Sequence, residues 1–169
     1  YADYRNVNLA RAAHLVDGTV LKPGATFSLN AVVGERTAQN GFTKGFIISD
    51  GVFREDLGGG VSQVATTTFN AAFFAGLEDV EHKPHSFYID RYPVGREATV
   101  AWGSVDLKFK NTTPYGIFID TSYTNRSVTV TMWSTKVYDS VKTVLGPRRD
   151  ITSPPTVHRE PGPKCITSS

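Results

Sequence analysis

The chain has 169 residues, of which 40% are apolar and 20% are charged, and its formal net charge at pH 7 is +2. This length and composition predict one folded domain and exclude an intrinsically disordered chain. The surplus of positive charge lies in residues 147–169, so the rest of the chain lacks the basic face that a nucleic-acid partner requires.

The first 24 residues predict a short helix that is closed by a turn. Asn6 or Asn8 is the candidate N-cap, and Gly18 is the expected stop. The apolar positions that recur at helical spacing are Leu9, Ala12, Ala13 and Val16.

Two extended stretches follow this helix. Pro23-Gly24 turns the chain into a brief extended segment, Thr26–Asn30. Farther on, Phe46–Ile48 and Val52–Phe53 flank Asp50-Gly51, which predicts a β-hairpin.

The segment from Gly58 to Gly76 is the most informative part of the sequence. Gly58-Gly59-Gly60 precedes an uncharged, alanine-rich run, which predicts a loop that leads into a buried helix over Ser62–Ala75. Ser62, Thr66 and Asn70 are spaced i, i+4, i+8 and should form one polar stripe on it. Although residues 57–77 carry no charge, they are too polar for a membrane span.

The second half of the chain has the character of strands. Apolar and polar residues alternate in Val105–Lys110, Ile117–Tyr123 and Val128–Trp133, as expected for antiparallel strands with one solvated face. The acidic residues at 78, 79 and 81 predict a solvated loop. Prolines cluster from residue 147 on, which predicts a domain over 1–146 and an extended tail or linker over 147–169. The predicted fold class is α+β, with both helices packed on a mainly antiparallel sheet.

Several residues are candidates for chemistry. Ser62, in the first helical turn, is either an N-cap or a nucleophile placed at the positive end of the helix dipole. The glycine loop before it allows close packing against a neighbouring element, a phosphate site, or an oxyanion cradle. His85, expected to lead into a strand beside the helix, is either structural or the base for Ser62. Glu97 and Asp106 do not make a convincing acid–base pair.

Metal and thiol chemistry are not expected. His82 and His85 lack a third ligand in the sequence, so no metal and no cofactor is predicted. Cys165 is the one cysteine and rules out an internal disulfide. Because it lies in a proline-rich tail with no nearby histidine pattern, it is not expected to be a catalytic thiol. An unpaired cysteine in an extracytoplasmic protein indicates a partner outside this chain.

The segment 58–70 resembles the signature of VanW-family domains, which run Gly-Gly-Gly-(Ile/Val)-Cys-Gln and continue into a threonine-rich helix with Asn-Ala. The resemblance covers roughly residues 4–121. Further residues fall in the family's order: Asn8, Ala12-Ala13, Pro23-Gly24, Phe27–Asn30, Gly41-Phe42, His85-Ser86, Tyr92, Gly95, Ala98–Val100, Asp106-Leu107 and Asn111.

The resemblance implies an extracytoplasmic, bacterial cell-envelope protein associated with glycopeptide resistance and peptidoglycan, with a membrane anchor before this domain. Some relatives are peptidoglycan L,D-transpeptidases that use the motif cysteine as nucleophile and a histidine as base. Carried over, these positions are Ser62 and His85. Candidate substrate contacts are Gly59, Gly60, Gln63, Thr66 and Tyr92.

This sequence departs from the family at the nucleophile, where Ser62 replaces the cysteine. A helix dipole contributes about 0.3–1 kcal/mol, which can help a thiol ionise but not a hydroxyl. Two hypotheses follow. The first is a non-catalytic envelope module that binds peptidoglycan stem peptides or another wall component. The second is an acyltransferase or hydrolase in which Ser62 works with His85 as its base. We favour the first, because the thiol is absent from an otherwise retained motif.

Overall fold

The computed structural model describes residues 2–49, 52–86, 88–153 and 156. The α+β prediction is confirmed, because helices and antiparallel strands pack together in one structure. The described part contains three helices, α1 (Asp3–Val16), α2 (Leu29–Val33) and α3 (Val61–Phe74), and the strands β1 (Thr19–Leu21), β2 (Thr26–Ser28), β3 (Lys44–Ser49), β4 (Val52–Leu57), β5 (Glu78–Glu81), β6 (Lys108–Lys110), β7 (Ile117–Tyr123) and β8 (Val128–Trp133).

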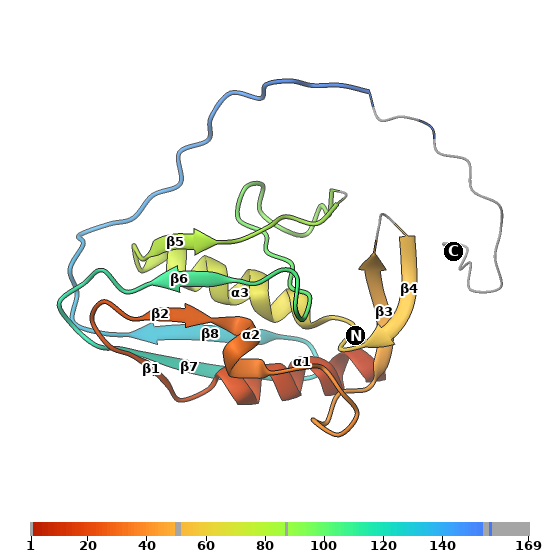
Figure 1. Ribbon diagram of the computed structural model, residues 1–169. Helices are drawn as coiled ribbons and strands as arrows, with labels where there is room; N and C mark the ends of the chain where they lie inside the picture. The colour runs from red at the N-terminus through yellow and green to blue at the C-terminus, as the bar shows by residue number, and fades with distance from the viewer. Residues whose placement is uncertain (1, 50–51, 87, 154–155, 157–169) are drawn as a thin grey trace.

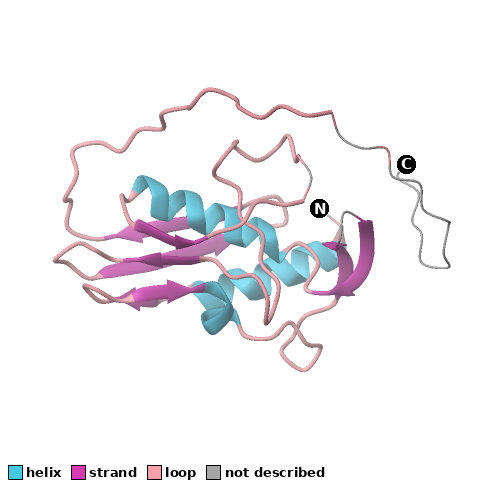
Figure 2. Ribbon diagram, turned by 45° about the horizontal axis from the view of Figure 1, so that its top comes forward, coloured by secondary structure: helices cyan, strands magenta, loops and turns pink. Residues whose placement is uncertain are grey.

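The strands form two three-stranded sheets and one hairpin. The sheet orders are β1-β7-β8 and β2-β6-β5, and the hairpin pairs β3 with β4. Figure 1 shows the two sheets side by side at one end of the molecule, while the hairpin stands at the other end near the N-terminus. Helix α1 contacts β7, α3 contacts β8, and the two long helices contact each other beside the strands (Figure 2).

The apolar positions of the predicted helices form the core. The four positions predicted on the first helix are buried in α1, and α3 adds Val61, Val64, Ala65, Phe69 and Ala72. Phe27 on β2 and Phe109 on β6 are directly paired, and their rings stack with centroids 4.6 Å apart. Burial of these side chains joins both sheets to both long helices.

The predicted cap of the first helix is wrong. Helix α1 begins at Asp3 with Ala2 at the N-cap, so Asn6 and Asn8 lie inside it. Asn8 is fully buried instead, and its Nδ2 donates hydrogen bonds of 3.0 Å to the carbonyls of Thr43 and Gly59. Its Oδ1 accepts the Thr43 N–H at 2.8 Å. Asn8 thus fixes α1 to the base of the hairpin and to the glycine loop.

Two predicted strands are shorter than expected, because side chains capture backbone N–H groups there. The segment predicted extended over Thr26–Asn30 ends at Ser28, whose Oγ accepts the Ala31 N–H at 3.0 Å and caps α2. The strand predicted from Val105 begins only at Lys108. The Asp106 carboxylate before it accepts the N–H groups of Leu107 and Asn30.

The loop predicted at the acidic residues is wrong, since Glu78–Glu81 forms β5. This strand pairs with β6, which places Glu78 opposite Lys110 and Glu81 opposite Lys108. The Glu81 carboxylate lies 2.8 Å from the Lys108 ammonium. Cross-strand pairs of opposite charge stabilise this edge of the sheet.

Residues 134–153 contain neither helix nor strand. Ser134 still donates to the Gly116 carbonyl and Tyr138 lies against Gly76, whereas Figure 1 shows the later part of this segment arching away from the sheets. The boundary between residues 146 and 147 remains a prediction. The hairpin strands form as predicted, although their Asp50-Gly51 turn, like Cys165, lies outside the described residues. Within the described residues, no helix has the length and apolar character needed to span a membrane.

Candidate functional site

The side chains of the polar stripe on α3, Ser62, Thr66 and Asn70, form a row of hydrogen bonds to the segment 96–100, which runs along the helix. Asn70 Nδ2 donates to the Arg96 carbonyl at 2.8 Å. Thr66 Oγ1 donates to the Ala98 carbonyl and accepts the Ala98 N–H, both at 3.0 Å. The predicted stripe is confirmed. It forms hydrogen bonds with backbone groups of the segment 96–100, which are not paired in a strand.

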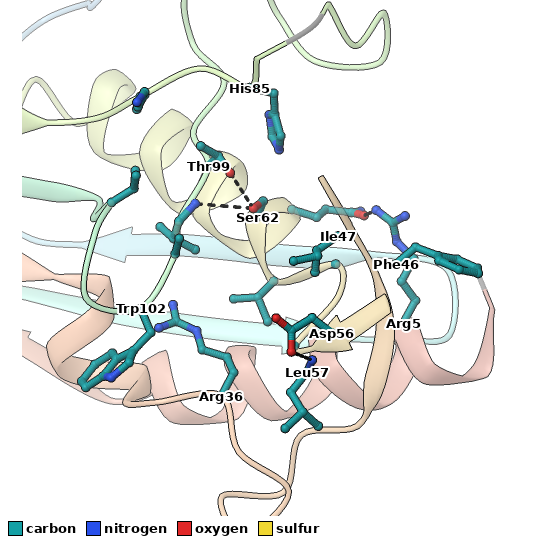
Figure 3. A pocket seen from close by; sticks show the side chains of 18 of the residues that line it. Arg5, Arg36, Phe46, Ile47, Asp56, Leu57, Ser62, His85, Thr99 and Trp102 are labelled. Carbon is teal, nitrogen blue, oxygen red and sulfur yellow. Dashed lines mark hydrogen bonds between the residues drawn. The ribbon is translucent and has the colours of Figure 1, made fainter. Parts of the chain in front are cut away.

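Ser62 is the last member of this row. Its Oγ lies 3.1 Å from Thr99 Oγ1, and the Val100 N–H approaches it at 3.5 Å (Figure 3). The capping interpretation is wrong, because α3 begins at Val61 and its N-cap is Gly60, without a side-chain cap. Ser62 is therefore a tertiary contact between the helix and the segment 96–100.

The glycine loop is shaped by close packing. A Cβ on Gly59 would lie 2.6 Å from the Gly45 carbonyl carbon, so the loop touches β3 backbone to backbone. A Cβ on Gly58 would lie 2.6 Å from Cγ of Arg36, and one on Gly60 would lie 2.8 Å from Cγ of Arg5. Both residues have positive φ, a conformation that glycine adopts without strain. The close-packing interpretation of the loop is confirmed.

His85 lies in a loop after β5, so the prediction that it leads into a strand beside the helix is wrong. Glu97 holds this loop, because its Oε1 accepts the His85 backbone N–H at 2.8 Å. Its Oε2 lies 3.7 Å from His85 Nδ1, a buried nitrogen without a hydrogen-bond partner among the described residues. The imidazole also stacks on Tyr92, with ring centroids 5.7 Å apart.

Burial lowers the pKa of His85, although the Glu97 carboxylate opposes this effect. The ring is therefore neutral near pH 7 and can accept a proton. Figure 3 shows it above the first turn of α3, pointing toward Ser62. Both residues are described, and no hydrogen bond joins them; the Ser62 hydroxyl contacts Thr99 Oγ1 instead.

Ser62 and His85 line one large cleft of about 1180 Å³ at the glycine-loop end of α3. Ligand pockets of small molecules commonly measure roughly 300–1,000 Å³, so this cleft has room for an extended ligand. Its walls come from the start of α1, the loop after α2, the β3–β4 hairpin, the His85 loop and the segment 99–105. Exposed aromatic side chains stand at its rim, namely Phe46 and Trp102 (Figure 3).

The comparisons with known proteins give the family. The family model described as "VanW like protein" matches residues 4–133. The chain belongs to the VanW family.

Two curated relatives agree with this assignment. The "Uncharacterized protein YoaR" of Bacillus subtilis (strain 168) is 38% identical over 136 residues, which cover 80% of this chain and 45% of that protein. The "Vancomycin B-type resistance protein VanW" of Enterococcus faecalis (strain ATCC 700802 / V583) is 27% identical over 120 residues, 67% of this chain and 43% of that protein. This VanW-family chain thus spans less than half the length of either relative. No solved structure matches it.

Most of the predicted site residues meet in the cleft of this VanW-family domain. The lining includes Gly60, Ser62, Gln63, His85 and Tyr92. The other two predicted contacts lie behind its wall, since Gly59 packs on β3 and Thr66 is buried against Ala98.

Glu97 and Asp106 are not expected from the sequence to form an acid–base pair. In the structure they have different partners, because Glu97 holds the His85 loop while Asp106 accepts hydrogen bonds from Ser28 and Asn30. His82 contacts Asp79 at 2.6 Å and stacks on Phe69. Across the described part of the chain, no three histidine, cysteine or carboxylate side chains gather as a metal site.

The cleft residues that sequence reasoning missed include Arg36, Thr99 and Trp102. Thr99 and Trp102 flank a segment without secondary-structure periodicity, so the sequence gives no sign of which side chains face α3. Arg36 follows Glu35 in an ordinary polar loop. These residues are recognised as cleft residues only by their position near the glycine loop, and that position is known only from the fold.

Proposed function

We propose that this VanW-family domain is a non-catalytic module of the bacterial cell envelope that binds peptidoglycan stem peptides in its cleft. One relative is named for vancomycin resistance, which supports a role connected with the cell wall. The family resemblance supports an extracytoplasmic location. The size of the cleft and the aromatic side chains at its rim fit an extended polymer segment better than a small cofactor.

The observation that carries the proposal is the environment of Ser62. Its hydroxyl completes the row of hydrogen bonds between α3 and the segment 96–100, and the nearest partner is Thr99 rather than His85. A serine nucleophile needs a base within hydrogen-bond reach, because its own hydroxyl does not ionise near neutral pH. We propose that a structural serine stands here in place of the family's cysteine, and that the cleft still binds peptidoglycan stem peptides.

Co-sedimentation with purified peptidoglycan sacculi tests this function. The wild-type domain should be retained, and Trp102→Ala should weaken retention by about tenfold or more, as loss of an aromatic contact predicts. Trp133→Ala is the matched control, because Trp133 is similarly exposed but lies on β8 outside the cleft. Absence of wild-type retention, or equal effects of the two substitutions, would contradict binding in the cleft.

A second candidate function is an acyltransferase or hydrolase that uses Ser62. It is favoured by His85, which lines the same cleft as Ser62, and by Glu97, whose Oε2 lies 3.7 Å from His85 Nδ1. In such a reaction Ser62 Oγ would attack an acyl carbon while its proton passes to His85, which then protonates the leaving amine. A serine-directed fluorophosphonate would leave an adduct on Ser62 that disappears in His85→Ala. No adduct is expected if Ser62 is structural.

A further inference from the structure

Arg36 carries a charge that the described residues do not neutralise by an ion pair. Its Nη1 donates hydrogen bonds to Asn30 Oδ1 at 2.6 Å and to the Gly34 carbonyl at 3.0 Å, both uncharged acceptors. The carboxylate that acts on it electrostatically is Asp106, whose oxygens already accept from Ser28, Asn30 and Leu107. The guanidinium is therefore held in place without a counter-ion in contact.

The second nitrogen, Nη2, is buried and has no hydrogen-bond partner among the described residues. Buried polar groups are usually paired, and an unpaired charged donor is costly. Burial also lowers the pKa of Arg36, which reflects the cost of keeping this charge away from water. A ligand that brings an acceptor to Nη2 would remove that cost.

The surroundings of Arg36 favour an anion. Its aliphatic stem packs on Gly58, and the stem of Arg5 packs on Gly60, so two arginines flank the loop at the start of α3. The first turn of a helix carries partial positive charge. Cleft-lining side chains include the cations Arg5, Arg36, Lys83 and Arg91 but only the carboxylates Glu35 and Asp56. Cationic groups therefore exceed anionic ones in the cleft.

We propose that Arg36 forms a carboxylate-binding subsite of the cleft, which receives a free carboxylate of the peptidoglycan stem peptide; this assignment rests on the proposed function. Arginine binds carboxylates through paired, planar N–H donors, and its rigid attachment to Asn30 and Gly34 orients those donors in advance. Neutral amides, such as amidated stem peptides, lack the charge that this site would complement.

Carboxylate binding at Arg36 should change the surroundings of the Trp102 side chain. Because Nη2 is covered in the structure, a carboxylate must displace neighbouring groups to reach it. Asn30 accepts from Arg36 and donates through Nδ2 to the carbonyls of Val105 at 2.9 Å and Ala101 at 3.4 Å. Those residues bound the turn that carries Trp102, which lines the same cleft as Arg36 (Figure 3). Indole fluorescence of Trp102 is thus a local signal of carboxylate binding.

The test compares a synthetic stem tetrapeptide that has free carboxylates with the same peptide in carboxamide form. Trp133→Phe is used as background, because the chain has two tryptophans and Trp102 then reports alone. The free peptide should bind roughly 10- to 100-fold more tightly than the amide, the span expected for a charge-assisted hydrogen bond. Arg36→Gln should abolish this difference, and Arg36→Lys should reduce it, since lysine lacks the planar donor pair.

The control is Arg126→Gln, since Arg126 lies in the exposed β7–β8 turn and should leave the preference intact. Equal binding of both peptides by the wild type would overturn the subsite without using any variant, as would a preserved preference in a folded Arg36→Gln protein. If sacculi are still retained in either case, the proposed function stands and only the subsite fails. If sacculi are not retained, the proposed function fails as well.

Discussion

The structural role assigned to Ser62 can be tested by a double-mutant cycle. Ser62→Ala removes the hydroxyl that contacts Thr99, and Thr99→Val removes the partner while keeping the side-chain shape. A hydrogen bond between two partly buried neutral hydroxyls contributes about 0.5–1.5 kcal/mol to the free energy of unfolding. The 3.5 Å approach of the Val100 N–H adds little. Each single substitution should therefore cost about 1 kcal/mol.

The coupling between the two substitutions distinguishes this contact from a helix cap. If Ser62 and Thr99 bond each other, the double mutant should cost less than the sum of the singles by about 0.5–1 kcal/mol. Urea unfolding followed by far-UV circular dichroism measures all four proteins. Thr121→Val is the control partner, because its Oγ1 donates to the Ala13 carbonyl on α1 and should add independently to Ser62→Ala. Coupling no larger than in this control would refute the assignment.

Three further outcomes follow from the structure. Gly59→Ala should destabilise the domain by about 1–3 kcal/mol, because its Cβ would meet backbone that cannot yield, whereas Gly116→Ala meets nothing within 4 Å and should be nearly neutral. Because burial lowers the pKa of His85, the unfolded chain binds a proton first as pH falls below 6.5; stability should then decline, and His85→Gln should flatten that decline. Trypsin should cut first after Arg148, Arg149 or Arg159 and leave the body folded, since Arg148 and Arg149 are exposed and outside regular structure.

For each of these predictions, one result would contradict the reasoning. Equal unfolding midpoints for the two alanine variants would mean that the glycine loop does not pack on β3 as described. A wild-type pH profile identical to that of His85→Gln would contradict a buried neutral imidazole, with the exposed His14→Gln as reference. First cleavage within the body, for example after Arg126, would contradict the expected protease sensitivity of the tail.

The helices could be predicted because their periodic apolar residues are local information. The spacing of Ser62, Thr66 and Asn70 also predicted one polar face on α3. What that face contacts depends on residues 96–100, whose sequence has no helical or strand period. The partner of the stripe, and with it the role of Ser62, therefore required the fold.

The errors in the sequence interpretation have local physical causes. A periodic pattern does not fix the first residue of a helix, and the N-cap is Gly60, two residues before Ser62. The acidic segment at β5 was predicted to be a loop because charge favours solvent, but lysines on β6 compensate it across the strands. Arg36 was overlooked because its unpaired nitrogen is a property of its surroundings rather than of the sequence.

The central claim is that the cleft binds peptidoglycan while Ser62 forms no covalent bond. Intact-protein mass spectrometry tests it most directly. The mass of the domain is measured after recovery from sacculi and, in a second sample, after treatment with a serine-directed fluorophosphonate. The wild type should be retained by sacculi and show an unchanged mass under both conditions, while Ser62→Cys should gain at most slow acylation, because a thiol has the lower pKa. A wild-type adduct on Ser62 that is lost in His85→Ala would contradict this account and establish an enzyme.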